Sequence, residues 1–289
     1  MRRLLTALIL SSLLTSTALG TTIKEKGRES VQKKVSELKR ERAALSFNQA
    51  LEALSYTDRA ILLLHQGKKE EALKLLSKAQ KNIEKLIKLH PQLQLLPLSQ
   101  QIVVMEYPGD LKEAEKEIEK AKELLNKGKV QDARLILTGL ADEIDVITTY
   151  LPLAMYDQVV KLAQKYIKAG KIDEALDALS LIRGSLVIDE VAIPIPFIKA
   201  TQYLKEAEKY QKSDKEKAIK LIEAAKRELQ LAKALGYAYD YSNTYDELLK
   251  EIRKIEDNLK EGKEITSSIR KLEEKVKELS KKAQMERRK

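Results

Sequence analysis

The stretch that decides the fold is GSLVIDEVAIPIPF, residues 184–197, because the segments on both sides of it have helical patterns and it does not. Pro194 and Pro196 stand one residue apart, and each biases the residue before it toward an extended backbone. The β-branched residues at 187, 188, 191 and 193 favour a strand. We therefore predict a short buried strand that runs into a helix started by proline.

Two further stretches, residues 95–110 and 143–153, also have extended patterns, and each comes directly before a predicted helix. An isolated strand cannot satisfy its own backbone hydrogen bonds. We therefore expect the extended stretches to pair into one small sheet of two or three strands.

Four helical hairpins are predicted from a recurring turn, in which an alanine follows a glycine or serine by five residues. The turns are at Gly67, Gly128, Gly170 and Ser213. The glycine ends one helix, and the alanine lies where the next helix packs back on it. At the last turn Ser213 and Glu216 form an S-x-x-E pattern, which predicts a capping box.

These turns lie 61, 42 and 43 residues apart, whereas tetratricopeptide repeats need a regular period of about 34. The spacing favours a mainly α fold, an irregular bundle of antiparallel helical hairpins with a small sheet. A regular TPR-like solenoid is the alternative.

The first twenty residues have the order of a secretory signal peptide. Arg2 and Arg3 precede a short apolar run, and Ala18 and Gly20 supply small residues before a cleavage point. An uncleaved membrane anchor is the alternative, but the run is shorter than the roughly 20 apolar residues a span needs. We expect a periplasmic protein, and the absence of cysteine excludes both disulfides and a lipid-modified cysteine.

The net charge of +10 is concentrated near the two ends of the chain. Residues 22–42 carry a net +4, residues 250–289 a net +5, and residues 43–249 a net −1. Because an exported protein rarely meets nucleic acid, we exclude that partner. The basic ends are interpreted as solvated helix faces, with at most peripheral contact to anionic envelope surfaces.

The C-terminal helix carries an apolar residue at alternating steps of four and three, over about two heptads. The positions of this seam are Ile265, Ile269, Leu272, Val276 and Leu279. So short a seam needs a partner, either the stripe of Val31, Val35 and Leu38 near the N-terminus or the same seam in a second subunit. Dimerisation is the slightly favoured hypothesis.

The sequence offers little chemistry. The two histidines, His65 and His90, both stand at predicted helix ends, where a histidine commonly interacts with the terminal carbonyls. No metal-ligand spacing, nucleophile elbow or phosphate loop is present in the sequence. Paired carboxylates of the glycosidase kind stay open, since helices rich in Glu always offer pairs. We predict a protein that is not an enzyme, with no cofactor and with no catalytic or metal-binding residues.

Aromatic residues gather around the extended stretch, and a phenol with one apolar face and one polar tip suits an adaptable binding surface. The alternative is that these tyrosines cover the core with their hydroxyls in water. The candidate binding surface consists of Tyr150, Tyr156, Pro194, Pro196, Phe197, Tyr203 and Tyr237.

Three segments together resemble the YfdX family of exported bacterial proteins: residues 151–156, residues 186–200 with the paired prolines, and residues 221–237 with Leu-Gly-Tyr at their end. The resemblance covers about residues 50–255. It implies a mostly α-helical periplasmic protein linked to stress or acid response, often oligomeric and without established enzymatic activity. The long basic N-terminal helix and the C-terminal extension depart from the family pattern.

The predicted organisation has four parts: a signal peptide (1–20), a basic amphipathic N-terminal helix (21–49), a YfdX-like helical domain (50–256) and a basic C-terminal helix with the heptad seam (257–289). A single helix is expected from Glu29 to His65. The first function hypothesis is a stress-related binding or holdase-like protein for unfolded or envelope proteins or a small hydrophobic ligand. The second is a scaffolding adaptor that forms homo-oligomers through its C-terminal helix.

Overall fold

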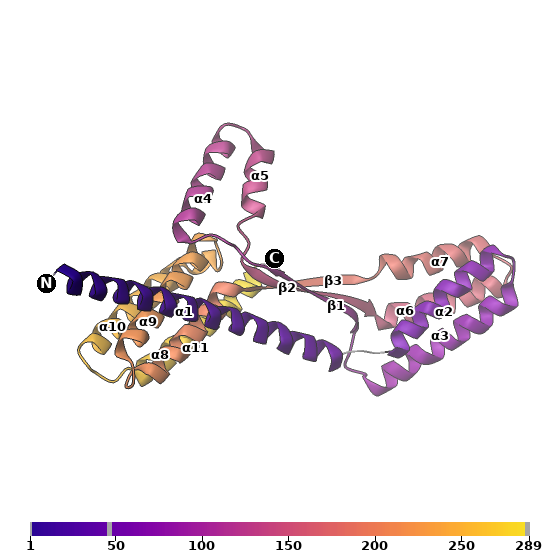
Figure 1. Ribbon diagram of the computed structural model, residues 1–289. Helices are drawn as coiled ribbons and strands as arrows, with labels where there is room; N and C mark the ends of the chain where they lie inside the picture. The colour runs from indigo at the N-terminus through magenta and orange to yellow at the C-terminus, as the bar shows by residue number, and fades with distance from the viewer. Residues whose placement is uncertain (1, 45–47, 287–289) are drawn as a thin grey trace. The chain divides into compact units, whose positions relative to one another are not determined.

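The computed structural model describes residues 2–44 and 48–286 (Figure 1). Its elements follow the chain as α1 (Arg2–Ala44), α2 (Asn48–His65), α3 (Lys69–Leu89), β1 (Leu95–Met105), α4 (Leu111–Asn126), α5 (Val130–Thr138), β2 (Glu143–Pro152), α6 (Leu153–Lys168), α7 (Ile172–Gly184), β3 (Val187–Pro194), α8 (Ile195–Tyr210), α9 (Lys215–Ala234), the 3₁₀ helix η1 (Tyr239–Tyr241), α10 (Ser242–Lys260) and α11 (Thr266–Glu286). The prediction of a mainly α fold built from helical hairpins with a small sheet is confirmed.

The three extended stretches form one antiparallel sheet with the strand order β1-β2-β3. The paired prolines act as expected, since Pro194 ends β3 and Pro196 lies in the first turn of α8. β3 is buried only over its last three residues, while Val187 and Ile188 are exposed. The expectation of a strand buried along its whole length is therefore wrong.

Contacts along the backbone divide the chain into two compact units. Unit 1 comprises Met1–Leu38, Ile102–Asp145 and Val191–Lys289, and unit 2 comprises Lys39–Gln101 and Val146–Glu190. Every strand passes from one unit into the other, since the boundaries fall inside β1, β2 and β3. In the described part of the chain, no helix has both the length and the apolar character that a membrane span requires.

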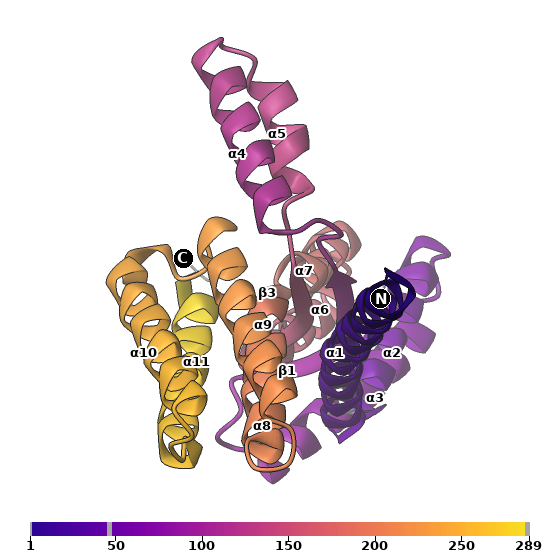
Figure 2. The same cartoon turned by 60° about the vertical axis from the view of Figure 1, so that its left-hand side comes forward.

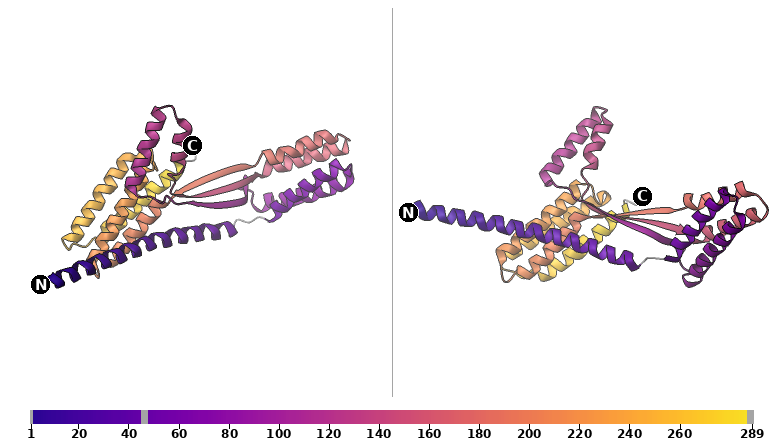
Figure 3. Two further views of the ribbon diagram at one scale, coloured as in Figure 1. Left: turned by 45° about the horizontal axis from the view of Figure 1, so that its top comes forward. Right: turned by 45° about the vertical axis from the view of Figure 1, so that its right-hand side comes forward.

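Unit 2 contains two of the predicted hairpins, α2–α3 and α6–α7, which Figure 3 shows as antiparallel pairs. Ala72 and Ala175, five residues after the turn glycines, are fully buried as predicted. Gly67 and Gly170 have φ of 75° and 78°, a left-handed conformation that glycine adopts without strain. The turn chemistry of these hairpins is therefore confirmed.

Unit 1 contains the hairpins α4–α5 and α8–α9, with α10 and α11 packed beside the second one (Figure 2). The last turn differs from its prediction. Asp214, not Ser213, is the N-cap of α9, and its Oδ1 accepts the N–H of Lys217 at 3.0 Å. The capping box is replaced by a single cap one residue later, because aspartate is an equally good N-cap and stands closer to the helix.

The expected helix from Glu29 to His65 corresponds to parts of two helices, since α1 ends at Ala44 and α2 begins at Asn48. The part of the predicted helix at residues 45–47 lies outside the described residues.

The C-terminal seam is buried within its own chain. Ile265, Ile269, Leu272, Val276 and Leu279 are at most 1% exposed, in one core cluster with residues of α8, α9 and α10. The hypothesis of a seam between two subunits is therefore corrected, because these five side chains are already removed from water. Its partners within the chain include α8 and α10, on which α11 packs.

We predict that Leu272→Ala lowers the free energy of unfolding of unit 1 by about 2–5 kcal/mol, the usual cost of a cavity at a fully buried leucine. Urea unfolding at several protein concentrations measures it. A midpoint independent of concentration is expected for an intramolecular seam, whereas a midpoint that rises with concentration would restore the dimer.

Candidate binding site

The seven residues predicted to form a binding surface are divided between the two units. Tyr150 and Tyr156 belong to unit 2, and the other five belong to unit 1. Tyr150 is half-buried, and the remaining six are buried, Tyr156 and Phe197 almost completely. Six of the seven side chains are therefore packed in the interior of their own unit, and they do not present an exposed tyrosine surface.

Hydrogen bonds of their hydroxyl groups explain why the tyrosine side chains are buried in the core. The Tyr237 hydroxyl accepts the backbone N–H of Asp142 at 2.9 Å, and the Tyr245 hydroxyl donates to the Tyr237 carbonyl at 2.7 Å. In unit 2 the Tyr156 hydroxyl donates to the Ala53 carbonyl at 2.8 Å. A buried tyrosine is tolerated when its hydroxyl is satisfied in this way, so these residues position backbone segments.

Phe197 is the one residue of the predicted surface that lines a described cavity. The cavity holds about 410 Å³, within the usual size range of small-ligand sites, and it is formed by α1, the end of β3, α8 and α11. Ile193, Phe197 and Ile198 supply an apolar wall. The expected concave surface near Phe197 is thus present, although its other walls differ from the prediction.

Five lysines line this cavity: Lys33, Lys34, Lys205, Lys277 and Lys281. They come from three helices, against a single acidic lining residue, Glu37. The Glu37 carboxylate lies 3.8 Å from Nζ of Lys34. The other four lysines form no ion pair within residues 2–44 and 48–286. The site therefore has an excess of positive charge beside apolar carbon, a combination that attracts anions.

The cavity continues toward a second hollow of about 750 Å³, because Lys33, Gln202 and Lys205 line both. Beneath this boundary Glu273 of α11 is buried, and burial raises the pKa of its carboxyl, while the nearby Lys205 and Lys277 act in the opposite direction. Glu273 therefore offsets part of the positive charge of Lys205 and Lys277, but it does not line the first cavity.

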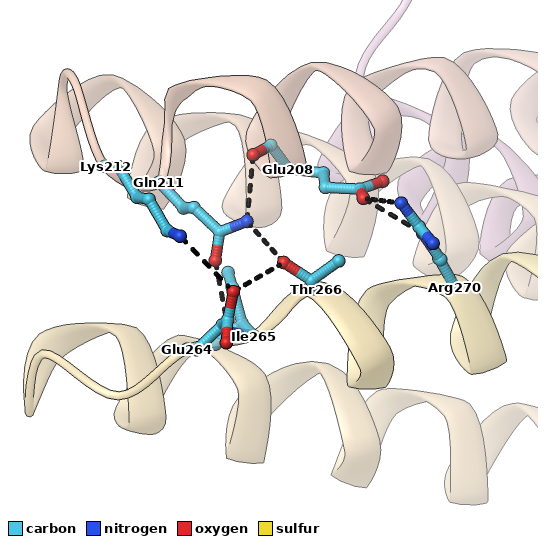
Figure 4. A network of polar contacts seen from close by, with 7 residues as sticks. All are labelled: Glu208, Gln211, Lys212, Glu264, Ile265, Thr266 and Arg270. Atoms are coloured by element: carbon cyan, nitrogen blue, oxygen red, sulfur yellow. Dashed lines mark hydrogen bonds and ion pairs between the residues drawn. The ribbon is translucent and has the colours of Figure 1, made fainter.

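A polar clamp fixes α11 against the end of α8 (Figure 4). The side chain of Gln211 accepts the N–H of Ile265 at 3.1 Å and donates to the Thr266 hydroxyl at 2.8 Å. Arg270 donates to the Glu208 carboxylate at 3.0 and 2.9 Å from two nitrogens. Because each contact pairs an early residue of α11 with a late residue of α8, the helices run antiparallel, and Lys277 faces the middle of α8.

Gly27 lets α1 lie close to α8. A Cβ at this position would stand 2.3 Å from the Tyr203 hydroxyl oxygen and 3.5 Å from Cγ of Lys199. Ile23, one turn earlier, packs in the core of unit 1, and Val31, one turn later, is also buried. This stripe holds α1 in the position from which Lys33 and Lys34 reach the cavity.

Two carboxyl groups, those of Asp142 and of Glu228 on α9, interact with Lys199 of α8. The Asp142 carboxylate lies 3.9 Å from Lys199 Nζ and accepts the N–H of Tyr107 at 3.4 Å. Burial raises the pKa of Asp142 to about 6, although Lys199 and the Tyr107 N–H lower it. Burial likewise raises the pKa of Glu228 to about 7, reinforced by Asp142 and opposed by Lys199 and Arg227.

The backbone of Asp142 ties this cluster to the site. Its carbonyl accepts the N–H of Ile195, the first residue of α8, at 2.8 Å. Through this bond and the bond to Tyr237, Asp142 fixes the start of α8, from which Phe197 and Ile198 project. Within the described residues no cluster of three or more His, Cys, Asp or Glu side chains could hold a metal ion.

Sequence reasoning missed the lysines because lysine alternating with glutamate at helical spacing is usually a solvated face. The available signal was the net charge, which is basic only near the two ends of the chain. Those ends are α1 and α11, which the structure brings to the same cavity.

Comparison with known proteins gives one family. Residues 53–192 match the family described as "YfdX protein". A solved structure of YfdX from Salmonella Typhi is 18% identical and aligns over 51% of this chain and 91% of that chain, with a TM-score of 0.35, too low to support an argument. No curated protein matches the sequence. The resemblance noted in the sequence is confirmed, with a narrower matched range.

Replacing Gly27 with alanine tests the approach of α1. Alanine favours an isolated helix by about 1 kcal/mol over glycine, but here its Cβ would collide with Tyr203. We expect Gly27→Ala to lower the free energy of unfolding by about 1–3 kcal/mol, as over-packing usually does, and Ser36→Ala on the exposed face of α1 to change it little. A stabilised Gly27→Ala protein in urea unfolding would contradict the contact.

Replacing Glu228 with glutamine tests the buried carboxyl pair. Because its pKa is raised from 4.5 to about 7, the folded state binds the proton more tightly than the unfolded state, so this group's contribution to stability falls as pH rises from about 4.5 to 7. We expect Glu228→Gln to equal the wild type near pH 4.5 and to exceed it by about 1–3 kcal/mol at pH 8. Urea unfolding across pH measures this difference.

The exposed variant Glu115→Gln is the control and should show no such trend. A Glu228→Gln protein that loses stability equally at pH 4.5 and pH 8 would mean that the carboxylate is not destabilised by its burial.

Proposed function

We propose, from the match of residues 53–192 to the YfdX family, that this chain is a non-enzymatic binding protein. It would work in the periplasm with a stress-related, holdase-like role. Its binding site is the lysine-lined cavity between α1, α8 and α11. The ligand or client carries negative charge. The signal-like pattern of residues 1–20 supports the proposed location.

One observation carries this proposal: four lysines that form no ion pair within 4 Å among the described residues line the cavity beside one apolar wall. Like charges gathered in a cleft repel one another and raise its positive potential. An anionic segment that enters relieves the repulsion, and the apolar wall of Ile193, Phe197 and Ile198 adds contact area that is not specific to one sequence. A cavity that combines positive charge with an apolar wall suits a holdase-like protein that binds partly unfolded or envelope proteins.

The alternative of a scaffold joined through the C-terminal helix has no observation in its favour, since the five seam residues are buried in the same chain.

The proposal is tested by reversing charge at the cavity. We expect the triple variant Lys33→Glu, Lys205→Glu, Lys277→Glu to lose at least fivefold in its capacity to suppress the aggregation of an acidic model client, because the potential of the cavity changes sign. All three side chains are exposed, so the fold should be retained, as circular dichroism will show. Light scattering of the heated client measures the effect.

The matched control is the triple variant Lys112→Glu, Lys116→Glu, Lys120→Glu on α4, which makes the same charge change at exposed positions away from the cavity. It should suppress aggregation as the wild type does. Equal suppression by all three proteins would locate the activity elsewhere, and no suppression by the wild type, together with no binding of any anion, would remove the proposed role.

A further inference from the structure

The cavity is lined by both apolar and positively charged residues. Ile193, Phe197 and Ile198 line it at the start of α8 and do not line the neighbouring hollow. Lys33 and Lys205 line both, so they lie at the boundary between the two spaces. Lys34 and Lys281 also line the first cavity, so apolar surface and positive charge lie next to each other there, a combination that neither a bare anion nor a purely apolar molecule would use in full.

Three lysines from three helices are placed to hold one anionic group. Lys33 belongs to α1, Lys205 to α8 and Lys277 to α11. Lys205 and Lys277 both line the cavity, and both act electrostatically on the buried Glu273 carboxyl. Lysine ammonium groups bind carboxylates and phosphates as mobile point charges, so a headgroup of either kind can be held here.

Resting on the proposed function, we infer that this cavity binds a single-chain anionic amphiphile. The headgroup lies among Lys33, Lys205 and Lys277, and the acyl chain lies along Ile193, Phe197 and Ile198. A volume of about 410 Å³ is near the lower end of small-molecule sites, which favours one short chain over a two-chain phospholipid. The shared chemistry is an anionic headgroup on one acyl chain, from a fatty acid or a lysophospholipid.

All residues that line the cavity lie outside the segment matched to the family, residues 53–192. Ser30, Lys33, Lys34 and Glu37 precede that segment, and Ile193 to Gln284 follow it. The inferred ligand is thus a property of the flanking parts of this chain.

The test is a chain-length series measured by calorimetry on the full chain below the micelle concentration. Hexanoate, octanoate and decanoate share one headgroup, and each buried methylene should strengthen binding about fourfold until the apolar wall is covered. Octyl phosphate and a short-chain lysophosphatidylglycerol form the phosphate arm and distinguish a lipid headgroup from a free carboxylate. Decanol, which lacks the charge, should bind at least tenfold more weakly than decanoate.

Two variants separate the ends of the ligand. Lys205→Glu with Lys277→Glu should weaken decanoate at least tenfold, and Ile198→Ser, at a half-buried position, should flatten the dependence on chain length while leaving hexanoate nearly unchanged. Phe197 is not used, since it is buried in the core and its loss would disturb the fold. The double variant Lys112→Glu, Lys116→Glu on α4 makes the same change in net charge at exposed positions and is the control.

Affinity that does not change with chain length would overturn the inference, as would equally tight binding of inorganic polyphosphate or an acidic peptide. In those cases the cavity holds polyanions, and the proposed binding role survives. Binding to phosphatidylglycerol vesicles without binding to monomers would also overturn it, because a flat surface would then be the partner. If no anion of any kind binds, both proposals fall together.

Discussion

The burial of the apolar stripe of α11 is the constraint on which the site depends. Removing a leucine or isoleucine side chain from water stabilises the fold by about 1.5–3 kcal/mol, and Ile269, Leu272, Val276 and Leu279 are all buried against the same chain. Two exposed lysines near each other repel by about 1 kcal/mol in water. The apolar stripe therefore decides the rotation of α11, and Lys277 and Lys281 must follow to the cavity.

The hairpins and the strands could be predicted because their signals are local. A glycine that ends a helix, an alanine five residues later and a proline that starts α8 each act within one or two turns. Asp214 shows the limit of such signals, since two adjacent residues could both cap α9 and only the geometry of the turn chooses between them.

The binding site could be predicted only in part, because its residues are separated along the chain. Phe197 was recognised, but a stripe such as that of α11 has the same pattern whether its partner is another subunit or α8. The prediction for the tyrosines was wrong for a related reason: a phenol can face water or a buried hydrogen-bond partner. For Tyr237 that partner is the donating backbone N–H of the distant Asp142. The role of Lys33 and Lys277 has no local signal in the sequence, because the two residues line one cavity only when α1 and α11 pack beside α8.

The arrangement of the units has a consequence for how the chain folds during synthesis. Unit 2 ends at Glu190, whereas unit 1 begins at the N-terminus and is completed only by the last third of the chain. Unit 2 can therefore close while α1 still lacks α8, and Ile23 and Val31 have no surface to cover. Exposed apolar stripes on incomplete chains are the usual starting point of misassociation. The chain is therefore most exposed to misassociation after Glu190 has emerged and before α11 is complete.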